Sequence, residues 1–249
     1  MAKKGEKILT QKQVCKLGLD KISVITADML EEYTSIGDYA FYRCIHLTSV
    51  TIPNSVTSIG EYSFGLCIDL KSIEIPDSVT SIGWGAFDSC IDLKSIEIPN
   101  SVTSIGEYAF YNCASLTSVA IDNSVKSIGY GAFKNCNSLP SVTIGNKTYK
   151  PQTVTDGKCK AYKAFGGSMA CRGFQYKEGE TYEFEGEPKL CKCGFHACLN
   201  LADVFTYYWG KIGKDIVIHE VELEGVSDER NAFASKVVSK KITIGKRIL

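Results

Sequence analysis

The sequence predicts an α+β protein, a solenoid of 23-residue repeats followed by a small α+β domain. The solenoid is predicted by a segment that recurs almost literally every 23 residues, because units this short must stack to bury their apolar sides. The second domain is predicted by the end of this repeat and by new strand patterns after it. We expect an N-terminal cap over 1–28, the solenoid over 29–149, a linker over 150–159 and the α+β domain over 160–249.

The repeat reads IPNSVTSIG from Ile52 and returns from Ile75, Ile98 and, as IDNSVKSIG, from Ile121. A worn copy, MLEEYTSIG, begins at Met29. Each copy continues with a Phe, a Cys, a Leu and a Ser-Val or Ser-Ile pair, and stacking should bury these apolar positions as columns. The columns are Val56/Val79/Val102/Val125, Ile59/Ile82/Ile105/Ile128, Phe64/Phe87/Phe110/Phe133 and Leu70/Leu93/Leu116/Leu139. After each short VTSI strand we expect a glycine turn with positive φ, at Gly60, Gly83, Gly106 and Gly129.

Five cysteines share the 23-residue spacing, namely Cys44, Cys67, Cys90, Cys113 and Cys136. They could form a disulfide framework or a column of small buried thiols. The odd total of eleven cysteines and the absence of a visible export signal favour free thiols in a reducing compartment. This interpretation places the protein in the cytoplasm.

The pattern IPxSVTSIGxxAFxxCxxLxSI resembles the BspA-like leucine-rich repeats of bacteria and some protists, over about residues 29–145. The resemblance implies a curved leucine-rich-repeat solenoid with β-strands on its faces. It also implies a role in adhesion or partner binding, often at the cell surface. The missing signal is a departure from that family pattern.

Two surface positions of the repeat are candidates for partner binding. On the long strand the outward residues read Thr51, Glu74, Glu97, Ala120 and Thr143, a polar face suited to sugar, to a weak protein contact or only to solvent. The residue after the repeat glycine reads Asp38, Glu61, Trp84, Glu107 and Tyr130. Trp84 is either an exposed anchor or a ring folded over its neighbour. We expect a protein partner to contact Trp84, Tyr130, Glu74, Glu97, Glu61 and Glu107.

Net charge is zero, which predicts no general attraction to nucleic acid. Residues 29–145 sum to −7 and the two flanking regions to +3 and +4. Either the basic ends fold back onto the acidic middle, or the middle is an acidic binding face. No apolar run is long enough to predict insertion into a membrane.

In the cap, Thr10 and Gln13 have capping-box spacing, and Ile8, Val14 and Leu17 form a helix-like apolar stripe.

The C-terminal domain is expected to have strands over 161–165, 173–186, 216–225 and 237–244, with a helix over 199–209. Cys191, Cys193, His196 and Cys198 could suggest zinc, but they are too close together for the usual paired knuckles. Zinc is therefore not expected, and neither is another metal or a cofactor.

The GFHAC segment, 194–198, resembles an uncharacterised domain family of bacterial and phage proteins. A weaker likeness to ADP-ribosyltransferases of the poly-ADP-ribose polymerase kind implies a ligand site with His196 and Tyr207 in the nicotinamide-stacking positions, together with Tyr162 and Glu222. The last strand, however, lacks the acid that this chemistry needs. The sequence therefore favours a non-enzymatic interaction protein, with an active or degenerate ADP-ribosyltransferase-like domain as the alternative.

Overall fold

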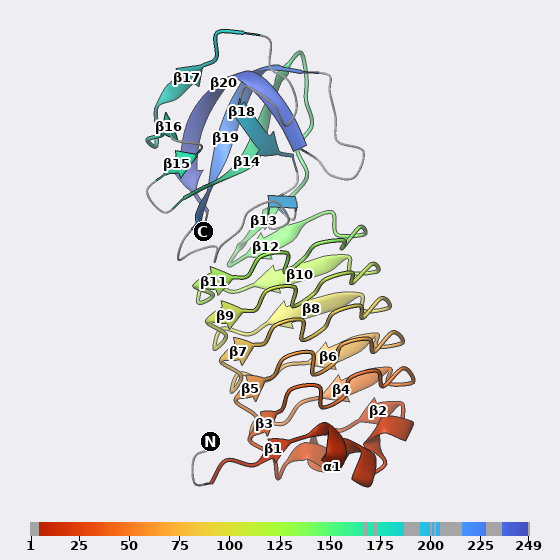
Figure 1. The fold of residues 1–249 in the computed structure, drawn as a ribbon. Helices are drawn as coiled ribbons and strands as arrows, with labels where there is room; N and C mark the ends of the chain where they lie inside the picture. The colour runs from red at the N-terminus through yellow and green to blue at the C-terminus, as the bar shows by residue number, and fades with distance from the viewer. Residues whose placement is uncertain are drawn as a thin grey trace. The chain divides into compact units, whose positions relative to one another are not determined.

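The computed structural model describes residues 5–166, 169–171, 174–186, 195–199, 201, 203–204, 216–227 and 236–248. The chain divides into two compact units, Met1–Thr148 and Tyr149–Leu249 (Figure 1). The first is a β-solenoid of stacked coils and the second is a small β-rich domain, as the sequence predicts. Most of the helix expected over 199–209 lies outside the described residues.

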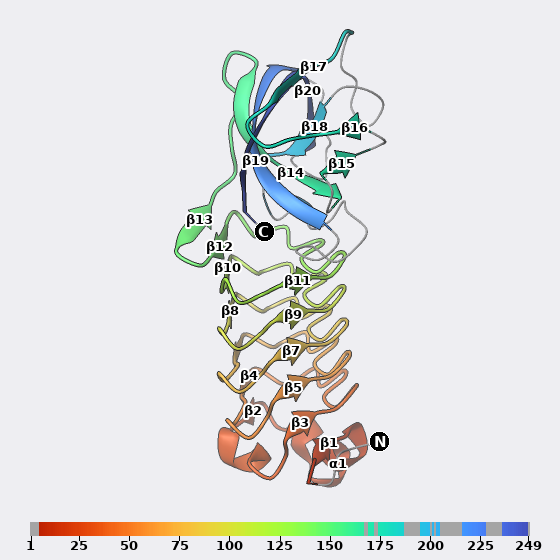
Figure 2. The same cartoon turned by 90° about the vertical axis from the view of Figure 1, so that its left-hand side faces the viewer.

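Each coil of the solenoid contributes one strand to each of two parallel series (Figure 2). Equivalent residues pair 23 positions apart, as Ile59 does with Ile82. The first series comprises β1 (Ile8–Leu9), β3 (Ser35–Ile36), β5 (Ser58–Ile59), β7 (Ser81–Ile82), β9 (Ser104–Ile105) and β11 (Ser127–Ile128). The second comprises β2 (Val24–Ile25), β4 (Ser49–Thr51), β6 (Ser72–Glu74), β8 (Ser95–Ile98), β10 (Ser118–Ile121) and β12 (Val142–Ile144). After a two-residue turn, β13 (Lys147–Tyr149) returns along β12 at the end of this series.

The four predicted apolar columns form the core of the solenoid, and every member is buried. The phenylalanine column stacks face to face from Phe41 to Phe133, with ring centroids 5.1–5.4 Å apart. This distance is close to the strand spacing of about 4.8 Å, so the rings keep the same repeat as the backbone. The apolar spine predicted from the repeat is confirmed.

The repeat glycines are needed for a different reason from the one predicted. Positive φ occurs two residues later, at Tyr39, Tyr62 and Gly85 among others, and not at Gly60, Gly83, Gly106 or Gly129. A Cβ at Gly106 would lie 2.5 Å from the carbonyl carbon of Gly83 in the preceding coil. The glycine column therefore permits close backbone stacking, and the prediction of a positive-φ turn at these positions was wrong.

The cysteine column consists of free, buried thiols. From Cys67 onward, each Sγ donates a hydrogen bond to the carbonyl of the Phe 26 residues earlier, at 3.1–3.2 Å. Burial raises the pKa of the Cys136 thiol to about 12 and also raises the pKa of Cys90 and Cys113. The thiols thus occupy apolar space while satisfying a carbonyl of the neighbouring coil.

The N-terminal cap adds one strand to each series before the first full repeat. Strand β1 pairs in parallel with β3, and β2 pairs with β4. The helix α1 (Gln11–Lys16) lies between them, and the Gln13 side chain accepts a hydrogen bond from the Thr10 amide at 2.8 Å. The predicted stripe is wrong in two of its members: Ile8 belongs to β1, and Leu17 is 53% exposed after the helix ends. Only Val14 packs inward from α1.

The C-terminal unit is a curved antiparallel sheet of β17 (Thr181–Glu183), β20 (Lys236–Arg247), β18 (Phe195–Cys198), β14 (Lys158–Gly166) and β19 (Ile216–Val226), in that order. Strand β20 also pairs with β19, so the strands from β20 to β19 close on themselves. Residues such as Phe165, Val221 and Ile242 fill the interior. Strand β15 (Ala170–Cys171) pairs antiparallel with β16 (Phe174–Gln175) in a separate sheet.

Candidate functional site

A row of aromatic side chains runs along the outer surface of the solenoid, with one ring from each coil. We name it the aromatic ridge; it consists of Tyr39, Tyr62, Trp84, Tyr108 and Tyr130. Successive ring centroids are 5.4, 4.9, 6.5 and 5.4 Å apart. All five rings are at least partly exposed, and Tyr39 and Trp84 are the most exposed, at 42% and 39%.

The ridge takes its ring from one of two adjacent repeat positions. These are the first and second residues after the repeat glycine. Where the second residue is Tyr62 or Tyr108, the first is an acid; where the first residue is Trp84, the second is Gly85. A Cβ at Gly85 would lie 2.6 Å from the Tyr62 ring, which therefore covers this glycine. The first position alone was predicted as a binding position, so Tyr39, Tyr62 and Tyr108 were not predicted. Comparing the two positions together would have revealed the alternation.

Trp84 is both a packed ring and an exposed one. Its indole is close to perpendicular to the Tyr62 and Tyr108 rings, at 78° and 73°, so edge contacts hold it on both sides. It nevertheless keeps more than a third of its surface in solvent. The two interpretations of Trp84 are therefore compatible, since its neighbours fix the ring while leaving part of it accessible.

Carboxylates flank the aromatic ridge. Glu61 and Glu107 are exposed and occupy the Trp84 position in the coils before and after it. Asp88 is half-buried nearby, and burial raises the pKa of its carboxyl group although Ser89 donates a hydrogen bond to it. Burial also raises the pKa of the Tyr62 hydroxyl, and the Asp88 charge adds to that effect. Negative charge thus lies beside the aromatic surface. Of the predicted partner-binding residues, Trp84 and Tyr130 belong to the ridge, and Glu61 and Glu107 flank it.

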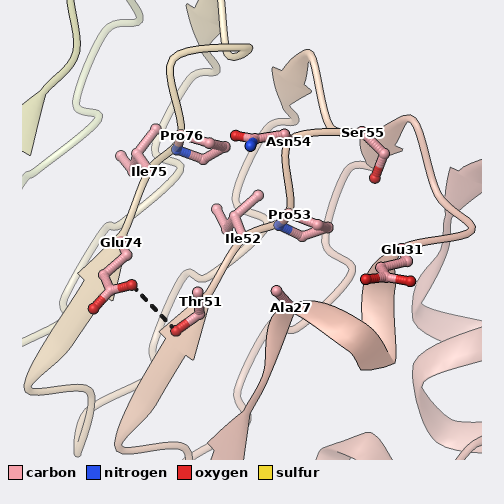
Figure 3. A pocket seen from close by; sticks show the side chains of 10 residues that line it. All are labelled: Ala27, Glu31, Thr51, Ile52, Pro53, Asn54, Ser55, Glu74, Ile75 and Pro76. Atoms are coloured by element: carbon pink, nitrogen blue, oxygen red, sulfur yellow. Dashed lines mark hydrogen bonds between the residues drawn. The ribbon is translucent and has the colours of Figure 1, made fainter.

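The other two predicted residues, Glu74 and Glu97, lie elsewhere, at the ends of β6 and within β8. Both are exposed. Beside Glu74 is a pocket of about 690 Å³ that extends to Glu31 and has Ile52, Pro53, Ile75 and Pro76 on its walls (Figure 3). Its Glu74 carboxylate accepts a 3.5 Å hydrogen bond from Thr51. The strand face is therefore hollowed at this point and is not a uniform flat sheet.

In the C-terminal unit, three of the four predicted ligand-binding residues lie on one face of the sheet. Tyr162 pairs with Cys198 on β18 and with Glu220 on β19, so their side chains share a face. His196 and Glu222 lie two residues along the same strands and therefore point the same way, opposite to the apolar interior. Strand β14 separates His196 from Glu222, and the two residues are also offset by four positions along that strand, so their backbones lie about 17 Å apart. Tyr207 lies outside the described residues, as do Cys191 and Cys193.

Tyr162 already has partners within its own unit. Its buried hydroxyl donates to the Lys150 carbonyl at 2.9 Å and accepts a hydrogen bond from Gln152 at 3.0 Å. The ring also packs edge-on against Tyr149. These contacts fasten the segment before β14 to the sheet, and they give Tyr162 a structural role.

Two buried polar residues that the sequence pattern did not predict, Lys163 and His219, lie on the interior side of the same sheet. Lys163 Nζ donates to the His196 carbonyl at 2.7 Å and lies 5.4 Å from the Phe165 ring centre. His219 Nδ1 is 2.8 Å from the Gly245 carbonyl oxygen, and its ring meets Phe165 edge-on. Both side chains are almost fully buried. Among the described residues, no group of three or more His, Cys, Asp or Glu could hold a metal ion.

Comparison with known proteins separates the two units clearly. Residues 34–159 match the BspA type leucine rich repeat region in six copies. Residues 159–249 match a domain of unknown function (DUF7666). No curated protein matches the sequence. The comparisons give no support to the ADP-ribosyltransferase interpretation. No helix in the described part of the chain has the length and apolarity to cross a membrane.

Solved structures of bacterial leucine-rich-repeat proteins are similar to the chain. A leucine rich cell surface protein from Faecalibacterium prausnitzii is 35% identical over 51% of this chain and 33% of its own, with a TM-score of 0.48. A leucine rich repeat protein of T. pallidum is 35% identical over 46% of this chain and 64% of its own, with a TM-score of 0.45. One from Bacteroides ovatus is 42% identical over 45% and 29%, with a TM-score of 0.43. The chain therefore spans less than two thirds of each of these proteins. With more than half of its residues matched by the family model, the chain belongs to the BspA-type leucine-rich-repeat family.

Proposed function

We propose that this protein binds a partner protein through the aromatic ridge, with Trp84 as the central anchor. The observation that carries the proposal is the partial exposure of Trp84 between two tyrosines that fix its orientation. Trp and Tyr dominate the energetic centres of protein interfaces, and a ring held in place loses little conformational entropy on binding.

The repeat architecture supports an interaction role. The ridge advances one ring per coil on a backbone fixed by parallel strand pairing, so its rings form a rigid row. Glu61 and Glu107 beside Trp84 carry negative charges, which favour a partner with a complementary, positively charged surface. A family that presents repeated surfaces for binding is consistent with this use of the solenoid.

The proposal is tested by comparing the wild-type chain with Trp84→Ala as bait in affinity capture from the source organism. The enriched protein is then titrated by calorimetry against both forms. Trp84→Ala should weaken binding at least tenfold, which is the loss expected for an energetic centre.

Ile91→Ala is the matched control, because Ile91 is exposed to the same degree, 38%, but lies outside the ridge. It should bind as the wild type does. Equal affinity of the wild type and Trp84→Ala, in samples with the same circular dichroism, would overturn the proposal.

A further inference from the structure

The strand face of the solenoid is interrupted at one place. Strands β2, β4 and β6 form one sheet and β8, β10, β12 and β13 form another, although consecutive coils continue to stack across the gap. At this break the repeat brings Glu74 and Glu97 to equivalent positions in adjacent strands. Elsewhere this position pairs Thr51 with Glu74, or Glu97 with Ala120. Like charges directly across a strand pair are unfavourable, so Glu74 and Glu97, and likewise Lys71 and Lys94 at an earlier repeat position, disfavour strand pairing at this junction.

The break changes the next residue along the chain. Ile52, Ile98, Ile121 and Ile144 are buried at the corner of their coils, whereas Ile75 is only half-buried. Ile75 lines the pocket of about 690 Å³ and also a neighbouring one of about 290 Å³. We name these two neighbouring hollows, which share Ile75, the strand-face groove. The larger volume lies within the range of sites that bind ligands.

The strand-face groove has an apolar floor and an acidic border. The floor is made by the corner isoleucines and prolines, as Figure 3 shows for Ile52, Pro53, Ile75 and Pro76. The border carries five carboxylates, those of Glu31, Glu74, Asp77, Glu97 and Asp122. In this fully described part of the chain, no Lys, Arg or His lines either hollow. The carboxylates are spread over successive coils, and each coil advances about 4.8 Å.

We propose that the strand-face groove binds an extended, basic segment of a partner protein. Lys and Arg side chains combine an aliphatic stem with a charged end, so their stems fit the Ile and Pro floor while their charges reach the carboxylates. An extended segment places alternate side chains on the same side about 6.7 Å apart, which lets long cationic side chains reach acids on successive coils. This binding site is separate from the aromatic ridge and does not depend on it.

The test uses the full chain and a fluorescent peptide of about ten residues that alternates Arg with Val, which spans about 33 Å when extended. Fluorescence anisotropy gives the affinity, with a Glu-Val peptide as the charge-reversed control. The double variant Glu74→Gln/Glu97→Gln should lose at least tenfold in affinity. The matched double variant Glu61→Gln/Glu107→Gln removes the same charge from the flank of the aromatic ridge and should bind the peptide as the wild type does.

Two further variants separate charge from shape. Ile75→Asn keeps every charge and should weaken binding by spoiling the apolar floor, whereas Trp84→Ala should leave peptide binding unchanged. Equal losses in the two double variants would show general attraction to an acidic solenoid and overturn the proposal. Failure of the wild type to bind the Arg-Val peptide would also overturn the proposal. So would a combined result in which calcium ions displace the peptide and Ile75→Asn binds the peptide as tightly as the wild type, because this would indicate a simple cation site.

Discussion

Replacing Gly106 by Ala tests whether close stacking of the coils explains the glycine column. The added Cβ would lie 2.5 Å from the Gly83 carbonyl carbon and 2.6 Å from the Trp84 amide nitrogen. Ordinary contacts begin near 3.4 Å, so the two coils must separate locally by almost 1 Å. Because both contacts are to backbone, no side chain can move aside, and we expect a cost of about 3 kcal/mol, at the upper end for overpacking.

The matched control is Gly18→Ala. Gly18 has φ of +68° with nothing within 4 Å of a Cβ, so this change adds left-handed backbone strain and no collision. Its expected cost is about 1 kcal/mol. Urea unfolding is followed by hydrogen–deuterium exchange on peptides from residues 58–110, so that the signal reports on the solenoid. If the free energy of unfolding falls by about 2 kcal/mol per molar urea, the unfolding midpoint of Gly106→Ala should be lower by about 1.5 M. A loss for Gly106→Ala equal to or smaller than that of Gly18→Ala would refute the stacking explanation.

Two other predictions concern the thiol column and the sheet break. Unfolded thiols ionise near pH 9.0 whereas Cys136 keeps its proton to about pH 12, so unfolding releases a proton between these values. Solenoid stability should therefore be independent of this thiol below pH 9 and fall from pH 9 to 12, by at most about 1.4 kcal/mol per pH unit. Urea midpoints across this range should fall less steeply for Cys136→Ala, and an unchanged slope would contradict the assignment. Glu97→Thr places a threonine opposite Glu74, as Thr51 already is on the other side, and should raise the free energy of unfolding of the solenoid by up to about 1 kcal/mol. Slower amide exchange at Ile75 is the expected sign that β6 and β8 have joined, and unchanged exchange would show that charge does not cause the break.

The repeat made the solenoid predictable because each apolar column samples the same environment several times. Val56, Phe64 and Leu70 each recur as the same residue type 23 positions later, so a single repeat pattern predicted every buried column. The role of Gly106 could not be found in this way. Its constraint comes from the backbone of another coil, and the positive φ occurs two residues later, where Tyr and Gly alternate.

Features that depend on a particular pair of residues were beyond the sequence pattern. The sheet break coincides with Glu74 and Glu97 in equivalent positions of adjacent coils, and the half-burial of Ile75 beside them becomes visible only once the coils are stacked. In the C-terminal unit alternation predicted the positions of β14, β19 and β20, but not β18 or the partners of Tyr162. They come from Lys150 and Gln152, in a segment expected to be only a linker.

The alternation of tyrosine and glycine beneath the aromatic ridge has a consequence for how such an array can lengthen. The ring of Tyr62 covers Gly85, and the ring of Tyr108 covers Gly131 in the same manner. Duplicating a single glycine-bearing coil would place two glycines in succession and leave the second without a tyrosine above it. Duplicating two coils together preserves the fit at every new junction. The last four repeats follow this two-coil order, so the natural unit of growth for this surface is a pair of coils, 46 residues long.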